Sequence, residues 1–242
     1  GQTSHMDSMT DPHTDLEINA RSQLSILEAC RHNNPDVKIV FASTRQIYGK
    51  PDYLPVDEKH PTRPVDVNGI NKMAGEWYHI LYNNVYGIRT CCLRLTNTYG
   101  PRMRIKDARQ TFLGIWVRLL LQEKTFQVWD GHQLRDFTYI DDCVEALLMA
   151  AFSDLANGKV YNLGGERPIT LLETAKTLID VAGKGEFQTM TYPEDRKRID
   201  IGDYYADYSL IKSELGWAPK TSLAVGLKKT VDYYKDHFER YL

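Results

Sequence analysis

The fold of this chain is decided by one short stretch, Val37-Lys38-Ile39-Val40-Phe41-Ala42-Ser43-Thr44. Its first six residues are mostly apolar and rich in β-branched side chains, the pattern of a strand buried on both faces of a parallel sheet. Two hydroxyl residues end the run. Because open α/β sheets bind their ligands outside the carboxyl ends of the strands, Thr44 is a candidate site residue by position alone.

The residues on either side of this strand predict a helix before it and a loop after it. Asp11 followed by Pro12 is a helix start, and apolar residues continue from there to about residue 32. The segment that follows the strand contains four prolines between residues 51 and 64. Proline interrupts both helices and strands, so this segment is expected to be a loop.

The loop leads into a second long helix, expected over residues 67–86. Asn68 and Lys72 are four residues apart on it, so both side chains share one face. A lysine there can hold a ribose or change the pKa of a neighbour, whereas an asparagine can only exchange hydrogen bonds. The alternative is that Lys72 is a solvated side chain near a helix start. Apolar residues at helical spacing predict a packed face beside the pair: Met73, Trp77, Ile80 and Leu81.

A second buried strand is predicted at residues 87–95, followed by polar and turn residues at 96–101. The carboxyl ends of the two strands therefore point at one edge of the sheet. Further on, the pattern predicts a helix over residues 110–122, strands at 125–129 and 134–140, a helix capped by Asp141 and a strand at 160–163. The last part predicts a helix after Pro168, a strand at 187–192, a short helix after Ser209 and a final helix capped by Ser222.

Length and composition exclude several classes of protein. The 242 residues are 42% hydrophobic, enough to bury a core as one large or two small domains. Lys and Arg number 30 against 32 Asp and Glu, so nothing in the net charge of −2 attracts nucleic acid or an anionic membrane. The four cysteines show neither metal-ligand nor disulfide-framework spacing. With no apolar run of membrane-spanning length and no signal peptide, a cytoplasmic protein without a metal site is expected.

Six short motifs follow one another along the chain. They are Ser43-Thr44-Arg45-Gln46-Ile47-Tyr48-Gly49; Asn68 with Lys72 and Glu76; Arg94-Leu95-Thr96-Asn97-Thr98-Tyr99-Gly100-Pro101; Arg135-Asp136-Phe137 with Asp141-Asp142; Asn162-Leu163-Gly164; and Leu215-Gly216-Trp217. Each motif alone is a weak signal, but together they cover nearly the whole chain. In this order the chain resembles the extended short-chain dehydrogenase/reductase family, in its subgroup of NAD-dependent nucleotide-sugar epimerases and dehydratases.

The resemblance implies an α/β fold. Its main part is a doubly wound, Rossmann-like parallel sheet that binds NAD or NADP, and a smaller carboxyl-terminal α+β lobe holds a nucleoside diphospho-sugar. Residues 1–105 are then the carboxyl-terminal part of the dinucleotide-binding domain, and residues 106–242 form mostly the substrate lobe, with segments that return to the main sheet. Homodimerisation through the helices near residues 11–32 and 67–86 is common in the family, and Trp77 with Tyr78 suits such a surface.

The resemblance also implies roles for single residues. In this family the nicotinamide takes a hydride from the sugar, a tyrosinate takes the hydroxyl proton, and a serine or threonine orients that hydroxyl. A lysine four residues after the tyrosine binds the nicotinamide ribose and lowers the tyrosine's pKa. Thr44 matches the serine or threonine and Lys72 the lysine. Ser43, Leu95 and Asn97 are expected to lie at the cofactor together with Lys72.

Three residues are expected at the substrate's diphosphate. Asn97 and Arg135 match the family's residues there, and Arg198 is a further candidate. A guanidinium suits this role because it offers two parallel donors to phosphate oxygens. For Arg198 the alternative is a solvated loop, since it lies in the charged run at residues 194–200.

The sequence departs from the family at Asn68, which stands where the tyrosine belongs. An amide has no titratable proton near neutral pH, so Asn68 cannot be the general base. Tyr48 and Tyr99 both follow strand ends and either could supply a phenol from another direction, although such tyrosines are more often packing residues. A water held by Asn68 and Thr44 is a further option.

A second departure is that no glycine-rich dinucleotide-binding loop follows any predicted strand. Without it the cofactor's pyrophosphate lacks its backbone donors. We therefore expect an inactive, amino-terminally truncated chain that does not bind the cofactor itself, from a parent that binds NAD or NADP. The parent is expected to be an epimerase or dehydratase acting on a nucleoside diphospho-sugar. The alternative is a non-catalytic nucleotide-sugar-binding or regulatory homologue.

Overall fold

A computed structural model of the chain describes residues 1–107, 111–193 and 200–242. Its centre is a parallel sheet in the order β1-β2-β7, formed by Lys38–Thr44, Arg89–Leu95 and Lys159–Asn162. The register pairs Thr44 with Leu95 and Arg94 with Asn162, so the three strands end at the same edge. The α/β fold with a parallel sheet is thereby confirmed.

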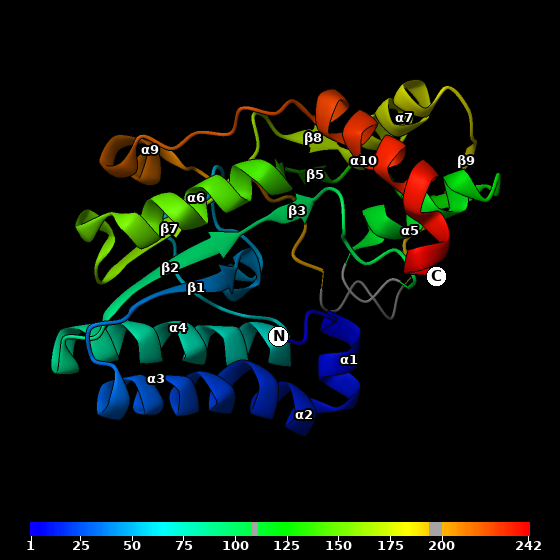
Figure 1. Cartoon of the computed structure of the whole chain (residues 1–242). Helices are drawn as coiled ribbons and strands as arrows, with labels where there is room; N and C mark the ends of the chain where they lie inside the picture. Colours follow the sequence, from blue (N-terminus) through cyan, green and yellow to red (C-terminus); the bar gives the residue numbers. More distant parts are fainter. Residues whose placement is uncertain (108–110, 194–199) are drawn as a thin grey trace.

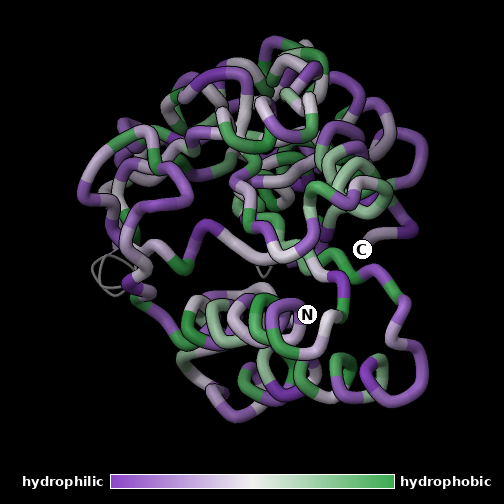
Figure 2. Tube along the Cα trace, turned by 90° about the vertical axis from the view of Figure 1, so that its left-hand side faces the viewer, coloured by the Kyte–Doolittle hydropathy of each residue, from purple (hydrophilic) through white to green (hydrophobic). Residues whose placement is uncertain are grey.

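Helices cover both faces of this sheet (Figure 1). On one face lies α4 (Val67–Tyr86), with the amino-terminal helices packed behind it. On the other lie α6 (Ile140–Phe152), which packs on β1 and β2, and α9 (Ser209–Leu215), which packs on β7. In the view turned by 90°, the layer that contains the amino terminus lies below the rest of the chain (Figure 2).

The predicted helix over residues 11–32 is present but broken. It comprises α2 (Pro12–Leu16), a π-helical turn (Glu17–Arg21) and α3 (Ser22–Asn33), and a separate helix, α1 (His5–Thr10), precedes it. Asp11 caps α2, and Pro12 occupies its first turn as predicted. The π turn inserts an extra residue into the helical path, which no pattern in the sequence announces.

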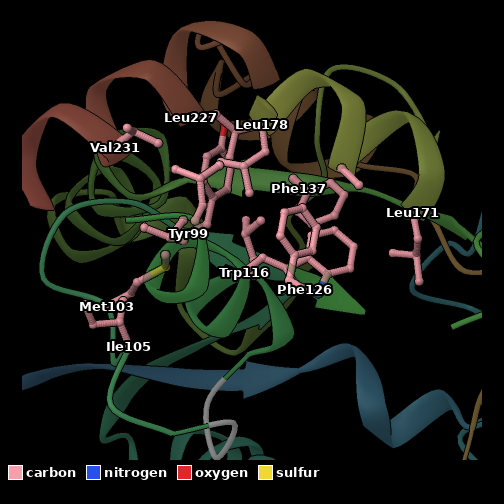
Figure 3. Close-up of a cluster of buried hydrophobic side chains, with 14 of the residues drawn as sticks. Tyr99, Met103, Ile105, Trp116, Phe126, Phe137, Leu171, Leu178, Leu227 and Val231 are labelled. Carbon is pink, nitrogen blue, oxygen red and sulfur yellow. The ribbon is translucent and has the colours of Figure 1, made fainter. Parts of the chain in front are cut away.

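Most of the remaining elements form a second lobe of small sheets and helices. β3 (Asn97–Tyr99) pairs with β6 (Phe137–Tyr139), β4 (Phe126–Trp129) with β9 (Phe187–Met190), and β5 (Leu134–Arg135) with β8 (Ile169–Thr170). Helices α5 (Phe112–Leu121), α7 (Leu171–Ala182) and α10 (Leu223–His237) enclose them. Short 3-10 turns occur at Arg45–Tyr48, Asp154–Ala156 and Phe238–Tyr241. The core of this lobe is aromatic, with Trp116, Phe126, Phe137 and Tyr99 gathered in one cluster (Figure 3).

The packed apolar face predicted for α4 is wrong in part, since Met73 and Ile80 are half-buried but Trp77 and Leu81 are exposed. Trp77 is 59% exposed and Leu81 is 49% exposed, while the buried side chains of α4 include polar ones, among them Asn68, Glu76 and His79. Glu76 and Asn68 are hydrogen-bonded to neighbouring elements and His79 to the Gly75 carbonyl within α4, which removes the cost of burying these groups. Trp77 and Leu81 therefore lie on the outer side of the helix.

Two smaller predictions also differ from the structure. β1 is not buried on both faces, since Ala42 is exposed and only Phe41 and Ser43 are buried. Asp141 lies in the first turn of α6 and does not cap it, because Tyr139 occupies the cap position. Across the described residues, no helix is both long and apolar enough to cross a membrane.

Candidate functional site

The carboxyl end of β1 presents neighbouring side chains to opposite faces of the sheet. Ser43 turns toward α4 and donates a hydrogen bond to Glu76 Oε2 at 2.7 Å. Thr44 lies on the opposite face by strand alternation and accepts a bond from the Gln46 N–H at 3.2 Å. The Thr44 side chain is half-buried at the edge where the strands end. Ser43 is therefore engaged in the packing of α4, and Thr44 is the hydroxyl placed toward the edge.

Lys72 reaches from α4 around the free side of β1. Its ammonium donates to the Ala42 carbonyl at 3.0 Å and lies 5.0 Å from the centre of the Phe41 ring. Burial lowers the pKa of this amine, and the carboxylate of Asp15 partly opposes that shift. A lysine ammonium has three N–H donors, so two more remain for a ligand that approaches over exposed Ala42.

Asn68 faces the amino-terminal segment. Its amide Nδ2 donates to the Gln2 carbonyl at 2.9 Å and to Asp15 Oδ2 at 3.0 Å, and only 3% of the residue is exposed. Asn71 donates to the other oxygen of Asp15 at 2.8 Å. Both Nδ2 hydrogens of Asn68 are thus used within the protein, and neither points to Thr44.

The two tyrosines considered as alternative bases are both hydrogen-bonded to partners within the protein. The Tyr48 hydroxyl donates to Asn162 Oδ1 at 2.7 Å and accepts from Arg94 at 2.6 Å, and burial raises the pKa of Tyr48 to about 12. Tyr99 lies in the aromatic core, where its hydroxyl bonds the Leu223 carbonyl at 3.4 Å (Figure 3). Burial raises the pKa of Tyr99 as well.

Arg45 connects the end of β1 to the second lobe. Its Nη2 donates to Asn97 Oδ1 at 3.2 Å, and its guanidinium lies 5.2 Å from the centre of the Tyr204 ring. Asn97 in turn donates through Nδ2 to the Asp136 carbonyl at 2.9 Å. Burial and the positive charge of Arg135 lower the pKa of Arg45 to about 10, so it stays protonated at neutral pH.

Arg135 is the other cation of this cluster. It is 6% exposed on β5, and its Nη2 lies 3.3 Å from Asp200 Oδ1 in an ion pair. The side chain of the adjacent Asp136 accepts from the Ala206 N–H at 3.0 Å, and burial raises the pKa of this carboxyl to about 6. Arg198, the third residue expected at the diphosphate, lies outside the described residues.

A buried polar network supports this edge from behind. Arg94 pairs with Glu76 through bonds of 2.5 and 3.1 Å and also holds the Tyr48 hydroxyl. Burial opposes ionisation of Arg94, but the bonds to Glu76 outweigh that and raise its pKa. Leu95, expected at the cofactor, ends β2 beside this network and is half-buried.

A hollow of about 580 Å³ opens beside β5. It is lined by polar residues and one methionine: Asp130, His132, Gln133, Thr189, Met190, Thr191 and Asp203. Asp203 accepts from the Leu134 N–H at 2.9 Å, which places this hollow next to Arg135 along the chain. No three metal-binding side chains converge anywhere in the described ranges.

Most of the expected site residues fall into two groups. Thr44, Lys72, Asn97 and Arg135 lie along one path at the carboxyl edge of the sheet, through Ala42, Arg45 and Asp136. Ser43, Asn68 and Tyr99 direct their polar groups elsewhere. Sequence reasoning missed Arg45 and Tyr204 as members of the cluster, although a cation directly after a candidate strand-end threonine is a visible signal.

Comparison with known proteins gives consistent matches over the chain. Residues 1–230 match the family described as GDP-mannose 4,6 dehydratase. The UDP-glucuronate 4-epimerase 4 of Arabidopsis thaliana is 31% identical over 249 residues, which cover 96% of this chain and 55% of that protein. The chain thus spans about half the length of this relative.

Solved structures agree with that match. A UDP-glucose 4-epimerase from Thermotoga maritima, solved with UDP-glucose, is 29% identical with a TM-score of 0.88 and covers 98% of this chain and 76% of that one. A UDP-glucose 4-epimerase from Thermus thermophilus, solved with NAD, is 30% identical with a TM-score of 0.85 and covers 97% of this chain and 75% of that one.

Proposed function

Because the chain belongs to the GDP-mannose 4,6 dehydratase family, within the extended short-chain dehydrogenases/reductases, we propose that its protein is an NAD-dependent enzyme that epimerises a nucleoside diphospho-sugar. The observation that carries this proposal is the continuous path at the strand ends. It joins Lys72, through the Ala42 carbonyl, to Thr44, and continues through Arg45 and Asn97. Such an edge is where open α/β sheets bind ligands.

The proposal gives each residue a task. Thr44 orients the sugar hydroxyl that reacts, because its own hydroxyl can donate and accept at the edge. Asn97 and Arg135 hold the diphosphate, with the guanidinium supplying charge-assisted donors. The polar hollow beside β5 takes the nucleoside, since its volume of about 580 Å³ falls in the range usual for small-molecule sites.

The residues at the free side of β1 fit a nicotinamide cofactor. Lys72 keeps donors for a ribose, and exposed Ala42 leaves an open surface next to it. NAD, when bound, supplies the acceptor for a hydride from the sugar carbon. We propose that Lys72 holds the ribose, and that Ser43 takes no part because Glu76 occupies its hydroxyl.

The proton acceptor can be inferred by considering the other candidate groups in turn. Asn68 cannot titrate, and Tyr48 and Tyr99 are held by internal partners with raised pKa values. We propose that a water at the Thr44 hydroxyl accepts the proton of the sugar hydroxyl and passes it to the solvent at the open edge of the sheet. Asn68 is a positioning residue that holds the Gln2 carbonyl.

Epimerisation is favoured over dehydration by the relatives. The plant relative at 31% identity and the two solved structures at 29% and 30% identity are all named 4-epimerases. The test is to incubate the complete gene product with NAD and a panel of UDP-sugars, and to follow the anomeric protons by NMR. We expect the 4-epimer of at least one sugar. Absence of any new sugar signal across the panel would overturn the enzymatic proposal.

A second candidate function is nucleotide-sugar binding without turnover. The observation that favours it is the Asn68 amide, which is turned to Gln2 and Asp15 and offers no base. Calorimetric titration of the complete gene product with UDP-sugars, alongside the NMR assay, separates the two functions. Saturable binding with no product supports this candidate, whereas binding with product supports the enzyme.

We also propose a homodimer that joins through α3 and α4. Its support is the row of exposed apolar side chains on these helices, namely Ile26, Ile70, Trp77, Leu81 and Val85, each between 48% and 60% exposed. Monomeric proteins rarely leave so large an apolar surface in water. A second copy of the same face is the simplest cover, since most soluble homo-oligomers are two-fold dimers.

A further inference from the structure

Arg45 differs from its neighbouring arginines in how its charge is compensated. Arg94 is paired with Glu76, and Arg135 is paired with Asp200. Arg45 forms no ion pair with any residue that the structure describes. Asp136, the carboxyl group whose charge acts most strongly on Arg45, accepts from the Ala206 N–H through Oδ2, and its Oδ1 has no hydrogen-bond partner in the described structure. Arg45 thus lies near a carboxyl group but forms no direct ion pair with it.

The guanidinium of Arg45 is nevertheless fixed in place. Tyr204 lies under it at 5.2 Å, and Asn97 accepts from Nη2 at 3.2 Å. Its Nη1 is buried without a hydrogen-bond partner in the described structure, and so is the Tyr204 hydroxyl. Unpartnered buried donors are costly and are usually reserved for something that binds. The site therefore holds a pre-oriented donor next to a second cation, Arg135.

The position of Arg45 in the chain indicates which part of a substrate it meets. This step rests on the proposed function, in which Thr44 orients the sugar hydroxyl that reacts. Adjacent Cα atoms are about 3.8 Å apart, so the residue after Thr44 lies within reach of the substituent on the neighbouring sugar carbon. A planar guanidinium is well matched to a carboxylate on that carbon, with two parallel hydrogen bonds.

We propose that Arg45 makes this site selective for a nucleoside diphospho-sugar whose hexose carries a carboxylate beside the reacting hydroxyl. The carboxylate supplies the direct ion pair that Arg45 lacks and accepts from its Nη1. The diphosphate remains with Arg135 and Asn97. The competing role for Arg45, a third contact to the diphosphate, predicts equal effects on acidic and neutral sugars.

Binding of two UDP-sugars to this 242-residue chain tests the proposal without requiring catalysis. UDP-glucuronate and UDP-glucose differ at the substituent in question, a carboxylate in one and a hydroxymethyl group in the other. Isothermal titration calorimetry should give UDP-glucuronate an affinity at least about tenfold higher, the effect of one charge-assisted hydrogen bond. Arg45→Gln should bring the two affinities within about twofold of each other, mainly by weakening UDP-glucuronate. Arg45→Lys, which keeps the charge but not the fork, should retain part of the preference.

Arg63→Gln is the matched control, because Arg63 is an exposed arginine whose Nη1 bonds Asp52 at 2.9 Å. It should leave both affinities unchanged. Equal affinities in the unaltered chain overturn the proposal even if Arg45→Gln fails to fold. Equal weakening of both ligands by Arg45→Gln overturns it in favour of a diphosphate contact. If neither ligand binds, the proposed function fails together with the selectivity, a result distinct from equal binding.

Discussion

The single residue Asn68 connects the amino-terminal residues, α2 and α4 through hydrogen bonds. It ties Gln2 and Asp15 to α4 through its side chain, and its backbone N–H donates to the Ser8 hydroxyl at 3.2 Å. The amino-terminal segment is therefore attached to the same helix that carries Lys72. A residue that looks like a lost catalytic group has a structural task of its own.

Substitution of Asn68 should test this task. Asn68→Ala removes two bonds and leaves the buried Asp15 with fewer donors, so we expect a loss of about 1–3 kcal/mol in the free energy of unfolding. Asn68→Asp places a second carboxylate against Asp15, and should cost more at neutral pH than in mild acid because like charges repel. Urea denaturation followed by circular dichroism measures both variants. A change below about 0.5 kcal/mol for Asn68→Ala would show that these hydrogen bonds contribute little to stability.

The pH dependence of stability should carry the signature of Asp136. Burial raises its pKa from 3.8 to about 6, so the folded state binds this proton more tightly than the unfolded chain. The stability linked to the protonated form is complete below the ordinary pKa and is lost as the pH rises through about 6. Asp136→Asn cannot titrate but can still accept from Ala206. Between about pH 4 and pH 7 the variant should gain about 2–3 kcal/mol relative to the unaltered chain. Parallel pH profiles of the two unfolding free energies would contradict this assignment.

At the same scale, the sequence predicted which elements carry the candidate residues but not where every side chain points. Thr44, Lys72, Asn97 and Arg135 were expected at the site from the family resemblance, and each lies on the strand or helix that the local pattern predicted or directly after it. The direction of a side chain is a different matter. Tyr99 follows a strand end like Thr44, yet its ring enters the core because Phe137 and Tyr139 pack against it. Only tertiary packing decides between those two orientations.

At the scale of elements, α4 and β2 are joined by the pair of Glu76 and Arg94. Both side chains are nearly inaccessible, 1% and 8% exposed, and the pair also binds Ser43 and Tyr48. It therefore links the helix that carries Lys72 to two of the strand ends at the candidate site. The pair stabilises the fold only while both partners are present, because removal of either one leaves the other charge buried without its partner.

Glu76→Ala should lower the free energy of unfolding by about 3–5 kcal/mol, since it leaves the Arg94 guanidinium buried without its carboxylate. The matched control is Glu17→Ala, which breaks an exposed pair with Arg21 at 2.9 Å. That control should cost less than about 1 kcal/mol. Chemical denaturation of both variants gives the comparison, and similar losses in the two would refute the role of the buried network.

The order of the elements was predictable from hydrophobic pattern and turn residues, and their contacts were less so. β1, β2 and β7 were expected as strands, and the helices between them were expected close to their observed bounds. The inward face of α4 was not, because hydrogen-bonded polar groups can be buried as well as apolar ones. The pairing of β5 with β8 joins two strands of two residues each, too short to give a pattern.

At the scale of the whole molecule, two lobes meet where the strands end. The first lobe supplies Thr44, Arg45 and Lys72, and the second supplies Arg135 and Tyr204. The helices α6 and α9 return to the sheet from the second half of the sequence, so the lobes share their packing (Figure 1). This arrangement could be expected from the sequence only through the family resemblance. No local sequence pattern predicts that a later helix packs on an earlier sheet.

The proposed homodimer is a property of the whole molecule. If α3 and α4 form a dimer surface, Trp77→Glu should convert the dimer to a monomer, because a charge cannot be buried there without a partner. Light scattering after size exclusion measures the mass directly. The control is Phe152→Glu, which alters a still more exposed aromatic residue, 88% exposed on α6. A monomer in the unaltered chain, or the same effect from both variants, would contradict the proposed surface.

A crystal structure of the chain with UDP-glucose tests the proposed substrate site most directly. We predict that the diphosphate lies within hydrogen-bonding distance of Arg135 and Asn97, and that the hexose lies at Thr44. A nucleotide sugar bound away from these residues, or crystals grown at saturating ligand that contain none, would contradict this prediction.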